Sequence, residues 1–356
     1  MVLLTYSDIA TPIRATAFNP VLTAPLLFIL KGLQQNPSFL SSVLPLPVQK
    51  FFLNLACGTS APKILKILLI LSGINYASKY LSQRALNNNF LRKQRDRRDE
   101  IVVITGGSGG IGSLIIKGLA KQGYKKIVNL DINPPTDHAE FDNIVFYKID
   151  LMDPASISEV STKIKEEVGN PSILLHVAGT GIGKTILNST PESVRLTFGV
   201  NTIAPFLLTK EFLPNMIKEN YGHVLVLASL ASFFTPAQMT DYCASKAAAL
   251  SFAEGLRQEV KHRYKAPGIR VSTVHPNWAK TPLTSVFGDM DHFYGRQLVP
   301  EQISDKVIEH VISGNGGQVF VPEDMAGSSL LRGVPSWIGE LARDNSKDMI
   351  IVNKDF

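Results

Sequence analysis

From residue 100 onward, short apolar runs alternate with longer segments in which apolar and polar residues mix as they do in helices. The apolar runs lie at residues 101–105, 126–131, 144–150, 172–179, 223–229 and 270–276. Segments of helical character separate them, such as residues 153–169 and 193–220. Nearly continuous apolar strands joined through helices are typical of a parallel sheet buried on both faces. The pattern therefore predicts an α/β fold with a doubly wound parallel sheet and helices on both faces.

Two apolar stretches precede this region, at residues 15–30 and 64–80. Pro20 and Pro25 interrupt the first stretch, and Lys66 interrupts the second. Each is shorter than the ~20 uninterrupted apolar residues of a typical single span. A secretory signal is not predicted, because the N-terminus lacks a basic segment and a small-residue cleavage site. We interpret the stretches as a membrane hairpin or as interfacial helices, with core helices of an N-terminal subdomain as the alternative.

Charge is distributed unevenly along the chain. Residues 1–99 contain 12 Lys or Arg and three Asp or Glu, whereas the remainder contains 24 and 27. A nucleic-acid-binding protein would carry its positive charge on the folded domain, so we expect no nucleic-acid partner. An anionic membrane surface accounts better for a basic extension. The basic segment at residues 84–98 predicts that the following domain faces the cytosol, by the positive-inside rule; a solvated linker is the alternative.

Composition bounds the class of protein further. Of 356 residues, 45% are hydrophobic and 19% charged, which excludes a disordered chain. The two cysteines, Cys57 and Cys243, are far apart and suggest neither a disulfide framework nor a metal site. We expect three parts: a membrane-associating extension with a basic linker (1–99), a catalytic domain (100–282), and a substrate loop, last strand and tail (283–356).

A glycine-rich turn, "TGGSGGIG" at residues 105–112, follows the first predicted strand and opens the first helix. Gly106 allows a tight turn, Gly110 lets the backbone approach a pyrophosphate, and Gly112 allows close packing of helix against strand. The N-terminus of the helix offers unpaired N–H groups to the phosphates. The turn, including Ser108 and Ile111, is therefore expected to bind a dinucleotide in a Rossmann-like fold.

Two acidic residues end the following strands. Asp131 lies where a carboxylate would accept the adenosine ribose hydroxyl and repel a 2′-phosphate, and the glycine turn contains no Arg or Lys to offset that repulsion. NAD is therefore expected in preference to NADP. The alternative is that Asp131 only caps the next turn. Asp150 is expected either at the adenine edge or as the cap of the helix that begins near residue 153.

The order of the motifs "TGGSGGIG", "HVAG" and "YCASK", with Asn201 and Ser229, resembles the short-chain dehydrogenase/reductase family over roughly residues 100–285. The resemblance implies that Asn201, Ser229, Tyr242 and Lys246 form the catalytic set. It also implies that Lys246 holds the ribose of the nicotinamide, that Gly179 lies close to the cofactor, and that Thr281 bonds the carboxamide.

The chemistry of the Tyr–Lys pair can be argued from the residues themselves. A tyrosine with its ordinary pKa of about 10 is a poor base near neutral pH. Lys246 lies one helical turn after Tyr242, so its charge is expected to lower the tyrosine pKa. The Ser229 hydroxyl would bond the substrate oxygen, and Asn201 would hold a water that links the lysine to solvent. Taken singly, Ser229 is an ordinary strand-end serine and Asn201 an ordinary helix residue.

Two positions depart from the family pattern. "HVAG" (176–179) stands where Asn-Asn-Ala-Gly is usual, and Pro276-Asn277 stands where Pro-Gly is usual. We interpret His176 as a structural histidine that replaces one amide. Neither departure affects the proton-transfer groups, so we expect an active enzyme.

The segments around residues 212–229 and 241–257 resemble the membrane-attached retinol and hydroxysteroid dehydrogenase branch. This resemblance implies a lipophilic alcohol or ketone as substrate, attachment to the endoplasmic reticulum or a lipid droplet, and a possible homodimer. The alternatives are an NADPH-dependent ketoreductase of lipid synthesis and a membrane-tethered, non-catalytic NAD-binding scaffold. Phe287, Phe293 and Tyr294 are expected in a substrate-covering loop, and Trp337 in an oligomer or membrane contact. No metal site is expected.

Overall fold

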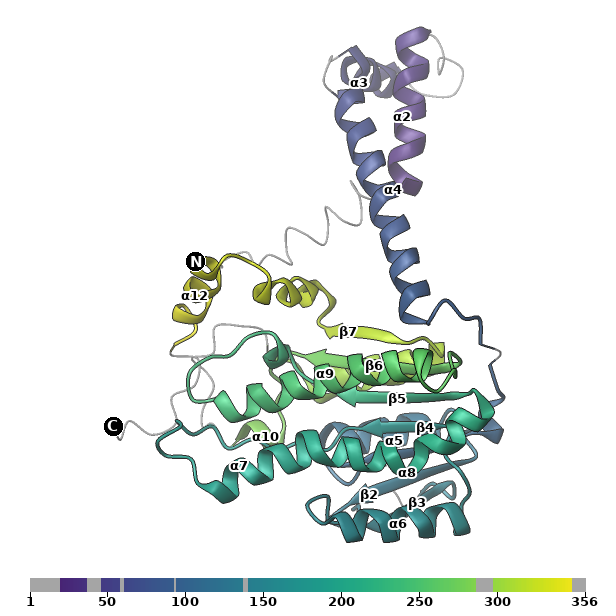
Figure 1. Cartoon of the computed structure of the whole chain (residues 1–356). Helices are drawn as coiled ribbons and strands as arrows, with labels where there is room; N and C mark the ends of the chain where they lie inside the picture. The colour runs from purple at the N-terminus through teal and green to yellow at the C-terminus, as the bar shows by residue number, and fades with distance from the viewer. Residues whose placement is uncertain are drawn as a thin grey trace. The chain divides into compact units, whose positions relative to one another are not determined.

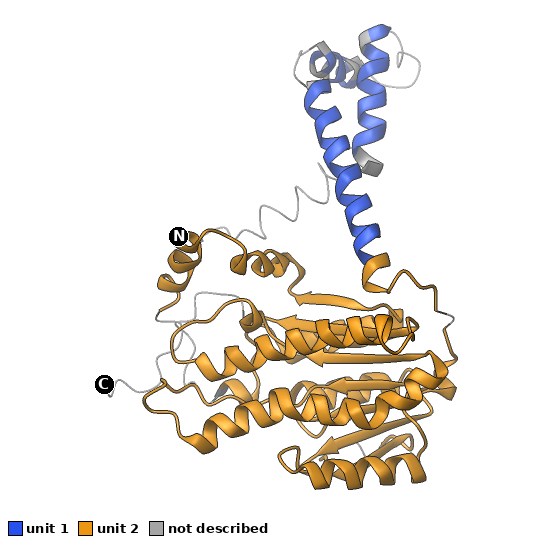
Figure 2. Ribbon diagram, in the orientation of Figure 1, with its two compact units in different colours: residues 1–83 blue, residues 84–356 orange. Residues whose placement is uncertain are grey.

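The computed structural model describes residues 20–36, 46–57, 61–92, 94–136, 140–285 and 297–347. The chain divides into two compact units, residues 1–83 and 84–356 (Figure 2).

The first unit is helical and contains α2 (Pro20–Gln35), α3 (Leu46–Cys57) and most of α4 (Ala61–Leu86). Leu30, Leu33 and Ala56 are buried together where α2 meets α3, and Leu65 of α4 packs against them. The rest of α4 exposes large apolar side chains, among them Ile67 and Ile74. Within the described residues, one helix, over residues 62–86, is long and apolar enough to cross a membrane, with a mean hydropathy of 1.3.

The apolar stretches of the sequence correspond partly to these helices. The stretch 64–80 lies within α4, and the described part of the stretch 15–30 lies within α2, which continues through Pro25. Residues 15–19 lie outside the described residues. The sequence analysis did not identify α3, a 12-residue helix with a central Gln-Lys pair, because such a short segment gives little periodic signal.

The second unit is built on a seven-stranded parallel sheet in the order β3-β2-β1-β4-β5-β6-β7 (Figure 1). Its strands are β1 (Ile101–Thr105), β2 (Lys126–Asp131), β3 (Ile144–Lys148), β4 (Ile173–His176), β5 (Gly222–Leu227), β6 (Ile269–Pro276) and β7 (Gly317–Val321). Strands β1, β4, β5 and β6 are buried at every position, as the continuous apolar runs predict. The predicted doubly wound α/β fold is confirmed.

Helices cover both faces of the sheet (Figure 1). α5 (Gly110–Ala120) and α11 (Pro300–Ser313) share one apolar core with one face. α6 (Pro154–Glu167), α8 (Ala204–Glu219) and α9 (Thr240–His262) share a second core with the other face. The remaining elements are α7 (Pro191–Phe198), a π-helical turn (Gly199–Ile203), α10 (Pro282–Ser285), α12 (Ser336–Asp344) and the 3-10 segments η1 (Arg97–Asp99), η3 (Leu230–Ser232) and η5 (Glu323–Arg332).

The basic segment after α4 is bound to the folded domain at the amino-terminal ends of the strands. Arg92 donates to the carbonyl of Gly222 at 2.7 Å, and Arg270 donates to the carbonyls of Asn87 (2.9 Å) and Phe90 (2.7 Å). These contacts correct the interpretation of this segment as a solvated linker. They also explain why the division between the units falls at residues 83–84 and not at the predicted boundary of 99–100.

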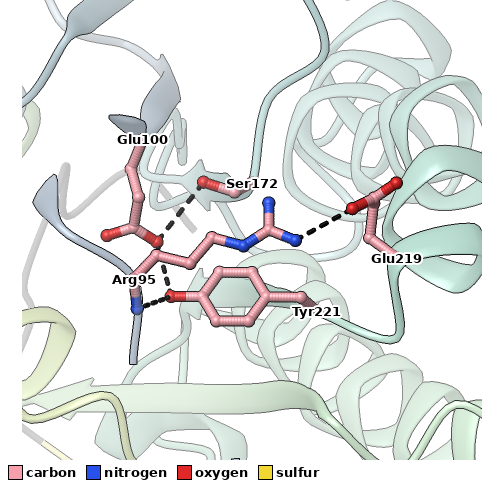
Figure 3. Close-up of polar contacts among 5 residues, drawn as sticks. All are labelled: Arg95, Glu100, Ser172, Glu219 and Tyr221. Carbon is pink, nitrogen blue, oxygen red and sulfur yellow. Dashed lines mark hydrogen bonds and ion pairs between the residues drawn. The ribbon is translucent and has the colours of Figure 1, made fainter. Parts of the chain in front are cut away.

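The side chain of Tyr221 also contacts this segment, and Figure 3 shows it with Arg95 and Glu100. The guanidinium carbons of Arg92 and Arg95 each lie 4.3 Å from the centre of its ring. Its hydroxyl donates to the buried carboxylate of Glu100 at 2.7 Å, and Arg95 pairs with Glu219 at 3.0 Å. Cation–π contacts with a desolvated ring contribute about 1–2 kcal/mol. The arginines therefore hold the segment in place and are not free charges.

Candidate active site

The strand order reverses between β1 and β4, which opens a crevice at the carboxyl ends of these strands. A cavity of about 850 Å³ lies there. Its lining includes the loops that follow β1, β2, β3, β4, β5 and β6, together with parts of α9, η5 and α12. The cavity contains most of the residues that the sequence analysis assigned to the site.

The glycine turn follows β1 directly. Gly106 and Gly110 have positive φ angles of 71° and 51°, which favour glycine. A Cβ at Gly106 would lie 2.7 Å from Cα of Ala178, and a Cβ at Gly112 would lie 2.0 Å from the carbonyl oxygen of Gly106. The turn is therefore packed so closely that larger residues would displace it. These glycines line the cavity together with Ile111. Ser108 does not line it, and its hydroxyl donates to the carbonyl of Asn133 at 2.6 Å.

The carboxylate of Asp131 lines the cavity beside the turn. It accepts the backbone N–H of Ser108 and that of Asn133, each at 3.0 Å. Asp131 thus caps the turn after β2, as the alternative interpretation proposed, and also ties that turn to the glycine loop. An ionised carboxylate has about four acceptor sites, so two bonds leave capacity for a ligand hydroxyl.

Asp150 also lines the cavity, and its carboxylate accepts the backbone N–H of Met152 at 2.8 Å. The cap of α6 is a different residue, Asp153, which accepts the N–H of Ala155 at 2.9 Å. The interpretation of Asp150 as the helix cap is therefore wrong.

The loop after β4 brings the cofactor end and the catalytic end of the cavity together. The hydroxyl of Thr105 accepts the N–H groups of Val177 and Ala178, each at 3.1 Å. The sequence analysis missed this role of Thr105, although the residue opens the quoted glycine motif. Further along the loop, a Cβ at Gly181 would lie only 2.8 Å from the ring of Tyr242. The loop is thus fixed at its start by Thr105 and lies in contact with the catalytic tyrosine candidate.

Ser229, Tyr242 and Lys246 come together at the other end of the cavity. The Ser229 hydroxyl donates to the carbonyl of Pro276 at 3.5 Å and lies near enough to the phenol of Tyr242 to influence its pKa. Lys246 is one helical turn beyond Tyr242 on α9, with its ammonium 5.7 Å from the centre of the tyrosine ring. The ammonium donates to the carbonyl of Leu227 at 2.8 Å. The arrangement places a hydroxyl, a phenol and an amine around one lined space.

Burial shifts the pKa values of Tyr242 and Lys246. It raises the pKa of Tyr242 to about 12, although the nearby Ser229 hydroxyl lowers it in part. Burial also lowers the pKa of Lys246 to about 8. The direction for the tyrosine is opposite to the lowering that the sequence analysis expected from Lys246, because desolvation of the phenolate outweighs the other effects. The neighbouring Cys243 is fully buried, and burial raises its pKa to about 12, so it is not a nucleophile.

Asn201 lies in the π-helical turn between α7 and α8, just outside the cavity lining. Its amide accepts the N–H of Thr180 at 2.8 Å and donates to the carbonyl of Thr180 at 2.8 Å and to Ser245 at 2.9 Å. A Cβ at Gly179 would lie 3.4 Å from the ammonium of Lys246 and 3.5 Å from the amide oxygen of Asn201. Asn201 and Lys246 thus both lie next to Gly179, and π-helical turns of this kind are frequent at functional sites.

The positions that depart from the family pattern have structural partners. His176 is buried, its Nε2 lies 3.0 Å from the Thr209 hydroxyl, and burial lowers its pKa to about 3. His176 is the last residue of β4, its side chain faces α8, and it does not line the cavity. Asn277 donates its backbone N–H to the carbonyl of Val321 at 2.8 Å, which connects the loop after β6 to β7. Thr281 lines the cavity, with its N–H on the hydroxyl of Thr284.

The carboxyl-terminal part of the chain contributes a wall that the sequence analysis did not predict. Met325 and Leu331 of η5 and Ala342 of α12 line the cavity. No motif marks these residues, and only the fold brings them near α9. Trp337 is 70% exposed. The residues expected in the substrate-covering loop, Phe287, Phe293 and Tyr294, lie outside the described residues.

Comparison with known proteins connects this geometry to a family. The sequence profile described as short chain dehydrogenase matches residues 100–291. The chain is 34% identical over 206 residues to Dehydrogenase RED2 of Cochliobolus heterostrophus, which covers 58% of this chain and 78% of that protein. It is 31% identical over 277 residues to human 17-beta-hydroxysteroid dehydrogenase 13, which covers 73% of this chain and 86% of that protein.

A solved structure described as 4-hydroxyisoleucine dehydrogenase complexed with NADH has a TM-score of 0.56 and 22% identity, and the match covers 62% of this chain and 96% of that one. A likeness at this level of identity supports the fold. Together with the profile match over more than half of the chain, it leads to one conclusion: the chain belongs to the short-chain dehydrogenase family and is an oxidoreductase that acts on CH–OH groups.

Proposed function

We propose that this protein is an NAD-dependent oxidoreductase that interconverts a lipophilic alcohol and its carbonyl compound. The observation that carries the proposal is the continuity of one cavity. The glycine turn and Asp131 line one part of it, and the side chains of Ser229, Tyr242 and Lys246 line another. A dinucleotide and an alcohol bound in this space would be held next to each other.

The cofactor end fits a dinucleotide. An added Cβ would clash at Gly106 and Gly112, whereas Gly109 and Gly110 have open space around them and line the cavity. The backbone N–H groups there and the N-terminus of α5 are therefore accessible to phosphates. Asp131 would accept a ribose hydroxyl and would repel a 2′-phosphate, which favours NAD over NADP. Solved structures of similar fold are described as complexes with NADH. When bound, the cofactor supplies the acceptor or donor of the hydride.

The residues of the chain move the proton. In alcohol oxidation, the phenolate oxygen of Tyr242 accepts the hydroxyl proton of the substrate while the Ser229 hydroxyl donates a hydrogen bond to the same substrate oxygen. Because burial raises the pKa of Tyr242 to about 12, the phenolate needs a nearby positive charge. The ammonium of Lys246 is the buried cation beside it. Asn201 holds the loop at Thr180 that encloses the lysine.

The substrate end is largely apolar. Its lining includes Phe234, Met239, Trp278, Met325 and Leu331. Burying a large apolar group contributes ~25 cal/mol for each Å² removed from water, so this lining favours a lipophilic substrate. Relatives described as 17-beta-hydroxysteroid dehydrogenase 13 and estradiol 17-beta-dehydrogenase 11 carry names that point to steroid alcohols. Retinoids and long-chain alcohols have the same chemical character.

We also propose that the first unit attaches the enzyme to a membrane, with the catalytic domain facing the cytosol, at the endoplasmic reticulum or a lipid droplet. The large apolar side chains exposed along α4 support this proposal, since a continuous apolar surface seldom remains in contact with water. Flotation of the full chain with phosphatidylcholine vesicles tests it. Ile67→Lys and Ile74→Lys together are expected to abolish flotation, whereas the same substitution at exposed Leu187 of the catalytic unit is expected to leave it unchanged.

The activity is tested with the purified full chain, a panel of steroid, retinoid and long-chain alcohols and ketones, and NAD(H) or NADP(H). Turnover with NAD(H) and a lipophilic substrate is the expected result. A lower Kd for NADPH than for NADH in a fluorescence titration would favour the NADPH-dependent ketoreductase. Tight NADH binding with no turnover of any substrate would instead indicate a non-catalytic, NAD-binding scaffold.

A further inference from the structure

A buried histidine lies behind Ser229 on the side away from the cavity. His275 is the penultimate residue of β6, and its side chain is 0% exposed. It does not line the cavity, and the proton-transfer scheme above does not use it. Among buried polar side chains, a histidine is costly to bury unless its ring nitrogens are hydrogen-bonded. Both nitrogens of His275 have partners.

The two hydrogen bonds fix the tautomer of the imidazole. Nδ1 lies 3.0 Å from the carbonyl oxygen of Ser229, and Nε2 lies 2.8 Å from the hydroxyl of Thr273. A carbonyl oxygen can only accept, so Nδ1 carries the proton and donates to Ser229. Nε2 is then the acceptor of the Thr273 hydroxyl. Burial lowers the pKa of His275 to about 4, so the neutral, Nδ1-protonated form is present at physiological pH.

The carbonyl of Ser229 belongs to a short turn that carries the catalytic hydroxyl. It also accepts the N–H of Ser232 at 3.0 Å, and the hydroxyl of Ser229 accepts the N–H of Ala231 at 3.1 Å. The same turn, η3, reaches the catalytic helix, because the Ser232 hydroxyl donates to the carbonyl of Lys246 at 2.9 Å. The bond from His275 therefore supports a turn that orients Ser229 and contacts the backbone at Lys246.

An aromatic stack holds the imidazole itself. The ring of Phe320 on β7 lies parallel to it, with 5.1 Å between ring centres and 24° between planes. The ring of Phe233, which follows η3, lies 4.9 Å away on a tilted plane. Because His275 and Phe320 are also register partners in the sheet, the imidazole is fixed by both strand pairing and ring packing. It has little freedom to turn away from Ser229.

We propose that His275 is a positioning residue: its Nδ1–H group holds the carbonyl of Ser229 so that the serine hydroxyl points at Tyr242 and at the substrate oxygen. The inference rests on the proposed function, in which Ser229 bonds the substrate. The ring of His275 would contribute to stability in any case, so the donor and the ring have to be separated by experiment.

Two substitutions make this separation. His275→Phe keeps an aromatic ring against Phe233 and Phe320 but removes the donor. His275→Asn removes the ring but places an amide N–H near the position of Nδ1. The measurements are kcat, KM for the alcohol, Kd for NADH and the midpoint of thermal unfolding, all on the full chain.

If His275 has a positioning role, kcat depends on whether the variant has an N–H donor at the position of Nδ1, and not on its thermal stability. For His275→Phe, kcat falls by about tenfold, the loss expected when one hydrogen bond no longer supports the transition state, while Kd for NADH does not change. For His275→Asn, the unfolding midpoint falls further but kcat stays near that of the wild type. Wild-type kcat in His275→Phe, or a kcat that falls in step with the unfolding midpoint in both variants, overturns the inference.

An independent measurement needs no turnover. A long-range ¹H–¹⁵N spectrum of the histidine-labelled chain is expected to contain, among the signals of its buried histidines, an Nδ1-protonated imidazole that disappears in His275→Phe. An Nε2-protonated His275 would overturn the inference even if His275→Asn does not fold. Absence of turnover by the wild type with every substrate overturns the proposed function and the inference together, whereas normal turnover by His275→Phe overturns the inference alone.

Discussion

The contact between Gly181 and Tyr242 provides a sharp test of the site geometry. Gly181 is buried in the loop after β4 and has no positive φ, so alanine is compatible with its backbone. The obstacle is the added Cβ, which would lie 2.8 Å from Cδ2 of Tyr242 and 3.4 Å from Cγ. Gly181→Ala therefore changes one methyl group and directs it at the ring of the proposed base.

The expected magnitude follows from the displacement. Ordinary contact begins near 3.4 Å, so the ring or the loop has to move by at least about 0.6 Å. A displacement of reacting groups by ~1 Å can cost about 100-fold in rate. We expect kcat to fall between about 10- and 100-fold, with a loss of about 1 kcal/mol in the free energy of unfolding from overpacking. Kd for NADH should change little, because the glycine turn is not altered.

The assay is steady-state NADH formation with a lipophilic alcohol, together with fluorescence titration of NADH and thermal unfolding. Gly255→Ala is the matched control, because Gly255 is on the same helix as Tyr242 but exposed, with nothing within 4 Å of its Cβ position. It is expected to raise stability by about 0.5–1 kcal/mol and leave kcat unchanged. A folded Gly181→Ala variant with wild-type kcat would refute the placement of Tyr242 against this loop.

Three further predictions concern substitutions at Lys246, Asp131 and Tyr221. The pKa of Lys246 falls from 10.5 to about 8 on folding, so between these pH values the folded chain binds fewer protons than the unfolded chain. The free energy of unfolding therefore increases as pH rises through that window. Lys246→Met should therefore abolish turnover yet raise the free energy of unfolding at pH 7 by ~3 kcal/mol, a gain that disappears above pH ~10.5 in denaturant titrations. A loss of stability at pH 7 would contradict this. Asp131→Asn should lower the NADH preference over NADPH by about tenfold in paired fluorescence titrations, because the repelling charge is lost, and an unchanged ratio would refute the role of the carboxylate. Tyr221→Phe leaves the Glu100 carboxylate without the shorter of its two O–H donors and should cost ~1–3 kcal/mol of stability with kcat unchanged, whereas a fall in kcat would mean that the segment at the amino-terminal ends of the strands influences the site.

The sequence predicted much of the sheet, because its strands are buried on both faces. The runs at 101–105 and 126–131 coincide with β1 and β2, and four other runs overlap β3 to β6. Strand β7, "GQVFV", was expected near the end of the chain but could not be located. It is short and three of its five positions are partly exposed, so it lacks the continuous apolar signal.

The glycine turn was located from its position between a strand and a helix, and Ser229, Tyr242 and Lys246 from the family resemblance; the structure places all of them in one cavity, and their roles stay predictions. Contacts between distant segments were not predictable. Arg92 and Arg95 look in sequence like part of a basic run, and only the fold reveals that Tyr221 lies between them. The direction of the Tyr242 pKa was also missed, since sequence shows the neighbouring Lys246 but not the desolvation that outweighs it.

The central claim is that the Tyr242 hydroxyl transfers the substrate proton. It is tested most directly by Tyr242→Phe, which removes one oxygen atom and keeps the ring against Gly181 and Met239. We predict that kcat for a lipophilic alcohol that the wild type oxidises falls by about 10²–10⁴-fold, with the unfolding midpoint and Kd for NADH preserved. A Tyr242→Phe variant that turns over the same alcohol at a rate close to that of the wild type would contradict the account.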